Sequence, residues 1–213
     1  MEINIGEYKD LMSRAVSPRP VFLITTISPT GVVNMAPFSA VTFCSYDPPM
    51  ILVSVGGKKH DLKYVPEELK DKLDLDEEKD TYANLKSSGE FVAHLVTEEL
   101  LDAVMIADRR YPREVSEVDK AKLTLVPSKL VRPPRVKEAK LSFECQVTNT
   151  FNIRADHLLV VGKGVAFYAD DSALSQGKLD TSRIKPVVHY FGDIFAICDR
   201  LIVREDRDRY KVD

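Results

Sequence analysis

Short runs of β-branched and aromatic residues, separated by turn-forming residues, recur along the chain. The first run, residues 21–28, ends at Pro29-Thr30-Gly31, which predicts a strand followed by a turn. Similar runs predict further strands at about residues 38–45, 50–55, 90–96, 141–151, 157–168 and 194–203. Because these runs follow one another without the rhythm of βαβ units, they favour an antiparallel barrel over a doubly wound sheet.

Helical spacing of apolar residues is confined to short segments. Residues 3–12 predict a helix that ends before Ser17-Pro18-Arg19-Pro20, where each proline disfavours helical geometry in the preceding residue. Residues 80–88 predict another helix, with Asp80 as the candidate N-cap and Gly89 as the candidate C′ residue. The expected fold class is therefore all-β dominated, with a few helices.

Two charged stretches interrupt the strand pattern. Residues 56–78 contain a run of mixed charge, and residues 108–134 are charged and rich in proline. We interpret both as surface insertions in a single domain that spans residues 1–213. Residues 204–213 are nearly all charged and are expected to fray or to lie against a partner subunit.

The composition argues against several classes of protein. The 213 residues include 30 Lys and Arg against 33 Asp and Glu, so the basic excess typical of nucleic-acid binders is missing. The apolar runs fall far short of the roughly 20 residues that span a bilayer. The first residues lack the basic start and apolar middle of a signal peptide. We expect a soluble, cytoplasmic protein that binds neither nucleic acid nor membrane.

The cysteines and histidines show no metal motif. Cys44, Cys145 and Cys198 are widely separated, which argues against a disulfide framework or a zinc knuckle. The histidines do not form HExxH, and both GxGxxG and GxxxxGK[ST] are missing from the sequence. No metal is expected, although convergence of His and Cys from distant strands stays open. His94, inside an apolar strand, is predicted to be a hydrogen-bonded core residue.

An ordered series of short segments carries more information than any one of them. The segments are Ser17-Pro18-Arg19-Pro20-Val21, Asn34-Met35-Ala36-Pro37-Phe38-Ser39, Ser45-Tyr46-Asp47-Pro48-Pro49, Val53-Ser54-Val55, Lys79-Asp80-Thr81-Tyr82-Ala83-Asn84-Leu85, Ser88-Gly89-Glu90-Phe91-Val92 and Asp156-His157-Leu158. In this order the chain resembles the flavin reductase-like family, the FMN-binding split barrels, over roughly residues 15–56, 79–105 and 140–168. The resemblance implies a homodimeric antiparallel split β-barrel that holds one FMN per subunit near the dimer interface and is reduced by NADH or NADPH.

The resemblance, together with residue chemistry, indicates where FMN would bind. Pro37 confines its strand to an edge, which is expected to leave neighbouring backbone donors free for the flavin ring; the alternative is an ordinary edge strand with a bulge. Lys79 and Thr81 at a helix start suit the phosphate, and the alternative is an ordinary capped surface helix. The candidate cofactor residues are Arg19, Asn34, Ala36, Pro37, Phe38, Ser39, Thr42, Phe43, Cys44, Ser45, Ser54, Lys79, Thr81 and Asn84.

Two histidines are candidate catalytic residues. His157 opens a strand at the lip of the barrel, and in proteins that the chain resembles a histidine here lies near the site where nicotinamide stacks. His189 is placed to reach the flavin of its own or of the neighbouring subunit. Surface hydrogen bonding is the alternative for both. Cys44 is interpreted as a small strand residue near the flavin rather than a redox thiol, because no positive neighbour is evident.

These observations predict an oxidoreductase in which FMN takes hydride from NAD(P)H and passes electrons to a small acceptor, such as free flavin, a ferric complex or a redox protein. One alternative is an FMN-binding electron carrier or sensor module that does not oxidise NAD(P)H directly. Another is a relative of pyridoxamine-phosphate oxidase, but the basic cluster that would bind its substrate is not evident. The two insertions leave the electron donor and acceptor open.

Overall fold

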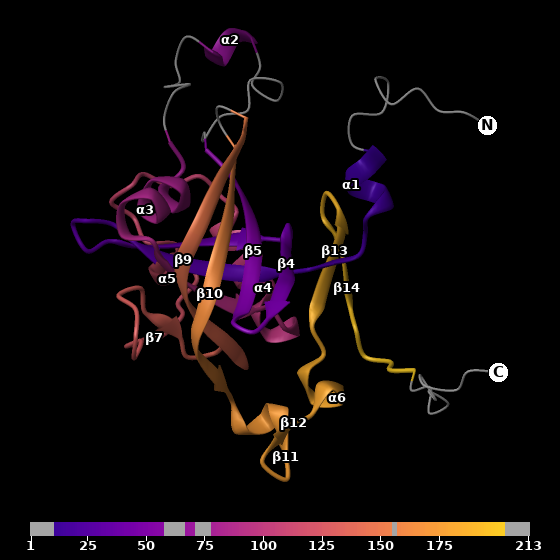
Figure 1. The fold of residues 1–213 in the computed structure, drawn as a ribbon. Helices are drawn as coiled ribbons and strands as arrows, with labels where there is room; N and C mark the ends of the chain where they lie inside the picture. Colours follow the sequence, from indigo (N-terminus) through magenta and orange to yellow (C-terminus); the bar gives the residue numbers. More distant parts are fainter. Residues whose placement is uncertain (1–10, 58–66, 71–77, 155–156, 203–213) are drawn as a thin grey trace, which may run out of the picture.

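The computed structural model describes residues 11–57, 67–70, 78–154 and 157–202. Within these ranges, seven antiparallel strands form the main sheet in the order β3-β2-β6-β9-β10-β5-β4. The strands are β2 (Phe22–Ile27), β3 (Val33–Phe38), β4 (Val41–Tyr46), β5 (Pro49–Gly56), β6 (Glu90–Leu95), β9 (Leu141–Arg154) and β10 (His157–Ala169). The predicted antiparallel, β-dominated fold class is confirmed. Figure 1 shows the long β9–β10 pair crossing the molecule.

The sheet curls into a barrel that stays open at one seam. β3 and β4 lie at opposite edges of the sheet, yet only Ser39 and Ala40 separate them. Three residue steps span at most about 11 Å, so the two edges approach each other there without pairing. The strand predicted over residues 38–45 corresponds to β4, but its predicted start is wrong, because Phe38 still belongs to β3 and the chain joins the other edge only at Val41.

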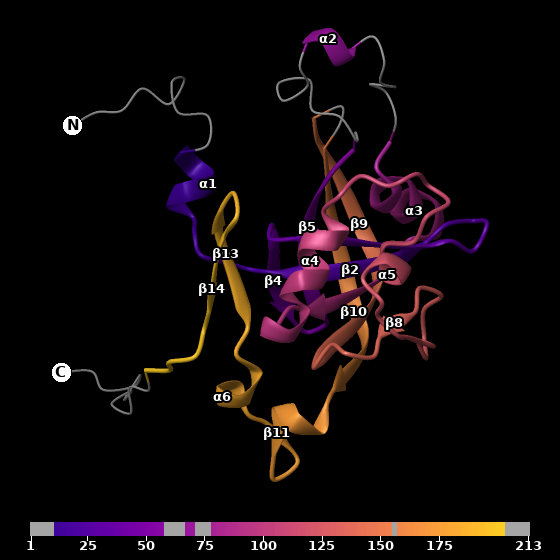
Figure 2. The same cartoon turned by 180° about the vertical axis from the view of Figure 1, so that it is seen from behind.

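A smaller sheet stands beside the barrel. It consists of β1 (Arg19–Pro20), β13 (Val187–Phe191) and β14 (Ile194–Ile197), and Figures 1 and 2 show the β13–β14 hairpin separated from the main sheet. The Val21 N–H donates to the Val187 carbonyl, which ties the hairpin to the barrel. The strand predicted at 194–203 ends at Ile197, and β13 was not predicted. Two short pairs complete the strands: β7 (Leu125–Val126) with β8 (Arg135–Val136), and β11 (Leu174–Ser175) with β12 (Lys178–Leu179).

The helices are short. They are α1 (Leu11–Ala15), α2 (Glu67–Lys70), α3 (Asp80–Ser88), α4 (Leu101–Ala107), α5 (Glu117–Lys120) and α6 (Thr181–Ile184), with 3₁₀ turns at Glu98–Leu100 and Asp171–Ala173. In Figure 2, α3, α4 and α5 lie on the same side of the main sheet. Residues 3–10 of the predicted helix 3–12 fall outside the described residues, and its last two residues belong to α1, which continues to Ala15. Most of the 56–78 insertion and the 204–213 tail also fall outside them. Among the residues described, no helix has the length and apolar character needed to cross a membrane.

The second charged stretch is partly buried. Residues 108–134 were expected to run over the surface, but Val118 is fully buried and Val131 is nearly so. Val118 packs in one core cluster with Leu23, Met35 and Val104. That part of the prediction is wrong, because a few apolar positions within a charged stretch suffice to anchor it to the core.

A buried carboxylate anchors the chain between β7 and β8. Glu144 on β9 accepts hydrogen bonds from the N–H groups of Lys129 and Leu130 at 2.8 and 2.7 Å. Burial alone would raise the pKa of Glu144, but these two backbone hydrogen bonds, together with a hydrogen bond from Tyr168 and the charge of Arg135, hold the pKa below its usual value. The charged form of Glu144 therefore fixes this loop against the sheet.

His94 is the hydrogen-bonded core histidine that the sequence predicted. Its side chain on β6 is fully buried; Nδ1 donates to the Leu23 carbonyl at 3.0 Å, and Nε2 accepts from the Val136 N–H at 2.9 Å. Burial lowers the pKa of His94 to about 4. The neutral ring thus links β2, β6 and β8.

This arrangement predicts a specific pH dependence of stability. Because the pKa of His94 falls from 6.5 in the unfolded chain to about 4 in the folded one, the unfolded chain binds the proton first as the pH drops. The free energy of unfolding should decrease by roughly 2–3 kcal/mol between pH 7 and pH 4.5. Urea denaturation of FMN-free protein across this range measures the slope. His94→Gln should remove most of it and His157→Gln should keep it; equal slopes in the two variants would contradict the assignment.

Candidate functional site

A cavity of about 560 Å³ lies where β3 meets the start of α3. Its walls come from β3, from the first residues of α3 and from the segment between α4 and α5. The lining residues are Asn34, Ala36, Pro37, Phe38, Lys79, Asp80, Thr81, Ala107, Asp108, Arg109, Arg110, Tyr111 and Glu117. The two halves of the predicted cofactor site, the Pro37 strand and the Lys79–Thr81 helix start, therefore border one cavity of a size usual for small ligands.

The β3 edge presents acceptors rather than the expected donors. The Met35 N–H points outward and donates to Glu117 Oε2 at 2.9 Å. N–H groups alternate sides along an antiparallel strand, so those of Ala36 and Phe38 face β2, and the next outward position is Pro37, which has no N–H. Carbonyl oxygens of Met35 and Pro37 are left on the outer side. Any ring that lies here would be recognised through its own N–H groups.

The start of α3 is an open anion-binding end. Lys79 is the N-cap, and no side-chain hydrogen bond caps the helix there; the first backbone bond of the helix runs from the Ala83 N–H to the Lys79 carbonyl. The prediction of Asp80 as N-cap is therefore wrong by one residue, whereas Gly89, with φ of 64°, is the C-cap as predicted. The N–H groups of the first turn of α3 have no acceptor within the helix, as at every helix start. The helix dipole adds positive potential at this end, beside the exposed Lys79.

Arginines from the 108–134 segment complete the charge of this end. Asp80 would repel a phosphate, but its Oδ1 lies 2.9 Å from Arg113 Nε, and Arg113 also donates to the Glu78 carbonyl. Arg109 and Arg110 line the same cavity. Sequence reasoning missed all three, because they lie in a charged stretch without periodicity, and only the fold brings that stretch over α3.

Four buried polar side chains hold α3 against the barrel. Asn34 Nδ2 donates to Thr81 Oγ1 at 2.8 Å and to Thr26 Oγ1 at 3.3 Å, and Asn84 Nδ2 donates to Thr26 Oγ1 at 3.0 Å. Asn84 thus faces Thr26 and does not line the cavity. The Thr81 oxygen accepts from Asn34, so its own hydrogen is still available to a ligand.

A second, smaller cavity of about 160 Å³ adjoins the first. The two share Pro37, Phe38 and Asp108. The remaining lining residues are Val21, Ser39, Val104, Met105, His189, Gly192, Asp193 and Phe195. Here Ser39 Oγ lies 3.0 Å from His189 Nδ1, and His189 Nε2 lies 2.9 Å from the Gly192 carbonyl. We call the two adjoining cavities together the combined site. The structure therefore brings His189 and Ser39 together at one end of this combined site.

The other two basic candidates, Arg19 and His157, do not line either cavity. Arg19 donates to the Ser13 carbonyl at 2.6 Å, and its Nη2 lies 3.3 Å from His189 Nδ1, so it supports His189 rather than the phosphate end. His157 pairs with Gly56 across the sheet. A methyl group on Gly56 would lie 3.6 Å from His157 Cε1 and 3.7 Å from Lys79 Nζ, which places His157 beside Lys79.

The β4 candidates do not line either cavity. Thr42, Phe43 and Cys44 are exposed, and Ser45 is half-buried, along an edge strand; Ser54 is half-buried on the adjacent β5. All three cysteines are free thiols. Across the described residues, no cluster of three or more His, Cys, Asp or Glu side chains is arranged to hold a metal ion.

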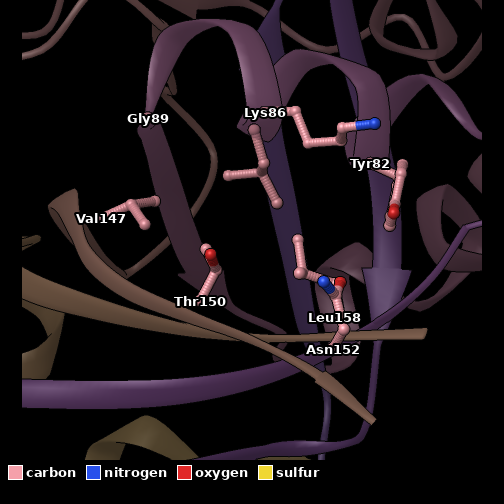
Figure 3. Close-up of a pocket in the computed structure, with 8 residues that line it drawn as sticks. Tyr82, Lys86, Gly89, Val147, Thr150, Asn152 and Leu158 are labelled. Carbon is pink, nitrogen blue, oxygen red and sulfur yellow. The ribbon is translucent and has the colours of Figure 1, made fainter. Parts of the chain in front are cut away.

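A third hollow suits an anion less well. This groove has a volume of about 610 Å³ and is bordered by Tyr82, Leu85, Lys86, Gly89, Val147, Thr150, Asn152 and Leu158. Figure 3 shows how most of these side chains lie around it. Its lining cation, Lys86, already bonds Glu78 Oε1 at 3.1 Å. The groove also lies toward the Gly89 end of α3, where helix carbonyls carry negative potential. A phosphate would bind more favourably at the Lys79 end.

Comparisons with known proteins agree with this architecture. The family model described as "Flavin reductase like domain" matches residues 12–197, which confirms the resemblance inferred from the sequence. An uncharacterised protein of Halalkalibacterium halodurans is 34% identical over 212 residues, covering 93% of each chain. Nitrilotriacetate monooxygenase component B from Bacillus cereus is 27% identical, with a TM-score of 0.81 over 96% of this chain and 98% of that one. The 2-nitrobenzoate 2-nitroreductase of Pseudomonas fluorescens, 24% identical, shares the fold with a TM-score of 0.75 over 95% and 92% of the two chains.

Proposed function

The chain belongs to the flavin reductase-like family, and on this premise we propose that it is an FMN-containing oxidoreductase that takes hydride from NAD(P)H and passes electrons to a small acceptor. The proposal rests above all on one cavity that is bordered both by an open helix start and by a strand edge with outward carbonyl oxygens. FMN supplies the redox chemistry, so the protein has to bind, orient and shield it. We further propose that the protein works in the cytoplasm, where free cysteines are usual.

The proposed cofactor pose follows the charge along the cavity. Lys79 and the first N–H groups of α3 would hold the single terminal phosphate, with Arg109 and Arg110 on the facing wall. The ring would lie along Pro37 and Phe38, where outward carbonyls accept from a ring N–H. One compact anion site and the lack of a dinucleotide motif favour FMN over FAD.

The two candidate histidines take different roles in this proposal. His157, beside Lys79, belongs to the phosphate end, where its ring adds a hydrogen-bond donor. His189, hydrogen-bonded to Ser39 in the smaller cavity, belongs to the end where hydride donor and acceptor react. The roles of His157 and His189 are thus separated by the length of the combined site.

We also propose that the protein is a homodimer. Within the described part of the chain, the outer edge of β4 has no strand partner, and this strand exposes Phe43 (51%) and Tyr46 (89%), whose ring centroids lie 4.6 Å apart. In the same sheet, β9 exposes Phe151 (54%) and Ile153 (55%). Free strand edges with apolar side chains favour association with another chain. A two-fold symmetric dimer is the commonest form of such association. A second copy would cover these residues, and Thr42 to Ser45 would then reach the partner's cofactor rather than their own.

Anaerobic stopped-flow mixing tests the proposed reaction. The FMN-loaded protein should lose its oxidised-flavin absorbance within seconds of mixing with NADH or NADPH, and a small acceptor added afterwards should restore it. The rate should saturate with the nicotinamide concentration. Stable FMN binding without bleaching by either nicotinamide would refute the reductase and leave an electron carrier or sensor.

Substitution of Lys79 tests the phosphate site. Lys79→Ala removes a charge-assisted contact worth roughly 1.5–3 kcal/mol, so FMN affinity should fall about ten- to a hundred-fold. Riboflavin lacks the phosphate, and its affinity should stay within twofold. Lys86→Ala, in the groove of Figure 3, is the matched control and should change neither affinity. Equal losses for both ligands, or a larger loss in Lys86→Ala, would move the phosphate elsewhere.

Light scattering tests the proposed assembly. At micromolar concentration the particle should have twice the 24.0 kDa mass of one chain. Phe43→Lys with Tyr46→Lys should shift it toward one chain, because like charges would oppose each other at the two-fold contact. Leu125→Lys, at an exposed position on β7, is the control and should leave the mass unchanged. A wild-type particle of single-chain mass that holds FMN tightly would contradict the proposal.

A further inference from the structure

Acidic side chains line the part of the combined site around Pro37 and Phe38, which we call the ring end because the proposed pose places the flavin ring there. Asp108 lines both cavities, and Asp193, in the turn between β13 and β14, lines the smaller one. Asp108 is also the C-cap of α4, so the carbonyl groups at that helix end add negative potential beside it. The carboxylate of Glu117 lies at the same edge of β3 and lines the larger cavity.

Positive charge gathers at the opposite end of the combined site. Lys79, Arg109 and Arg110 line the larger cavity only, at the start of α3 and on the wall that faces it. Among the described residues that line the smaller cavity, none is a lysine or an arginine. A phosphate bound at the start of α3 would offset much of the positive charge there. The ring end therefore keeps an excess of negative charge.

Hydrogen bonds keep the ring of His189 neutral, so it does not offset the two aspartates. Nε2 lies 2.9 Å from the Gly192 carbonyl, which can only accept, so Nε2 carries a hydrogen. Nδ1 lies 3.3 Å from Arg19 Nη2, which can only donate, so Nδ1 acts as an acceptor. Arg19 itself does not line the smaller cavity, and it also donates to the Ser13 carbonyl.

Asp108 and Asp193 lie close enough to influence each other. Partial burial raises the pKa of Asp108, and the charge of Asp193 raises it further, whereas Lys79 and, when protonated, His189 lower it. An additional negative charge placed beside these two carboxylates would be repelled by both.

We propose that Asp108 and Asp193 lower the reduction potential of bound FMN. Hydride transfer to oxidised FMN adds two electrons and one proton to a neutral ring, so the reduced ring carries one negative charge until a second proton binds. Carboxylates beside the ring disfavour this anion and have much less effect on the neutral oxidised ring. This inference rests on the proposed function, and it makes the reduced cofactor a stronger electron donor than free reduced FMN.

Anaerobic titration of the full-length protein with oxidised FMN and with dithionite-reduced FMN measures the effect. At pH 8, well above the ordinary pKa range of carboxyl groups, reduced FMN should bind about tenfold more weakly than oxidised FMN. In a two-electron reaction this ratio of dissociation constants lowers the potential by about 30 mV relative to free FMN. Equal or tighter binding of reduced FMN to the wild type would overturn the proposal.

Matched substitutions separate charge from packing. Asp108→Asn removes the charge at nearly constant shape and should reduce the ratio about fivefold, which raises the potential by about 20 mV. Asp193→Asn should act in the same direction, whereas Asp108→Glu keeps the charge and should stay within twofold of the wild type. Asp102→Asn, at an exposed position of α4 that lines neither cavity, is the control and should leave the ratio unchanged.

The outcomes of these substitutions decide the role of each aspartate. An unchanged ratio in Asp108→Asn, or an equal change in Asp108→Glu or Asp102→Asn, would overturn the proposal. An unchanged ratio in Asp193→Asn would overturn the part assigned to Asp193.

Dithionite reduces FMN without a nicotinamide, so this experiment does not depend on the proposed hydride donor. If NAD(P)H bleaches the FMN-loaded protein but Asp108→Asn keeps the wild-type ratio, the proposed function stands and this inference is overturned. If the ratio responds to Asp108→Asn but neither nicotinamide bleaches the flavin, the inference stands and the reductase is refuted. A protein that binds no FMN would refute both.

Discussion

The rest of the structure depends on the open edge of β3. The chain leaves β3 at Phe38 and enters β4 at the far edge of the sheet, so among the described strands β3 pairs only with β2. An unpaired edge at the core must have its backbone donors satisfied or removed. The Met35 N–H donates to the Glu117 carboxylate, and Pro37 has no N–H group. The cavity occupies the part of this edge that α4 and α5 leave uncovered.

Charge varies along the combined site in a way that matches one kind of ligand. At the α3 end, Lys79, Arg109 and Arg110 face the cavity, and Arg113 neutralises the nearby carboxylate of Asp80. At the other end apolar side chains share the wall with the hydrogen-bonded pair Ser39 and His189. Two aspartates, Asp108 and Asp193, also line this end, which disfavours an anionic group there. A molecule with a phosphate at one end and an uncharged ring system at the other would place each part in a favourable environment.

Strand-forming runs predicted much of the fold, and particular contacts explain where prediction stopped. The runs at 21–28, 90–96 and 141–151 correspond to β2, β6 and β9, because burial on the sheet favours β-branched residues there. His94 was predictable since a polar residue in an apolar strand needs partners. The break at Ser39 was not, because both flanking segments form strands equally well. Arg113 and Glu117 act through contacts between distant segments, which local spacing does not encode.

A crystal structure of the FMN complex tests the central claim most directly. The account predicts phosphate oxygens within hydrogen-bond distance of Lys79 Nζ and the Thr81 N–H, with the flavin ring extending along Pro37 and Phe38 toward Ser39. A phosphate bound in the groove of Figure 3, near Lys86, would contradict it. A ring that does not contact β3 would contradict it as well.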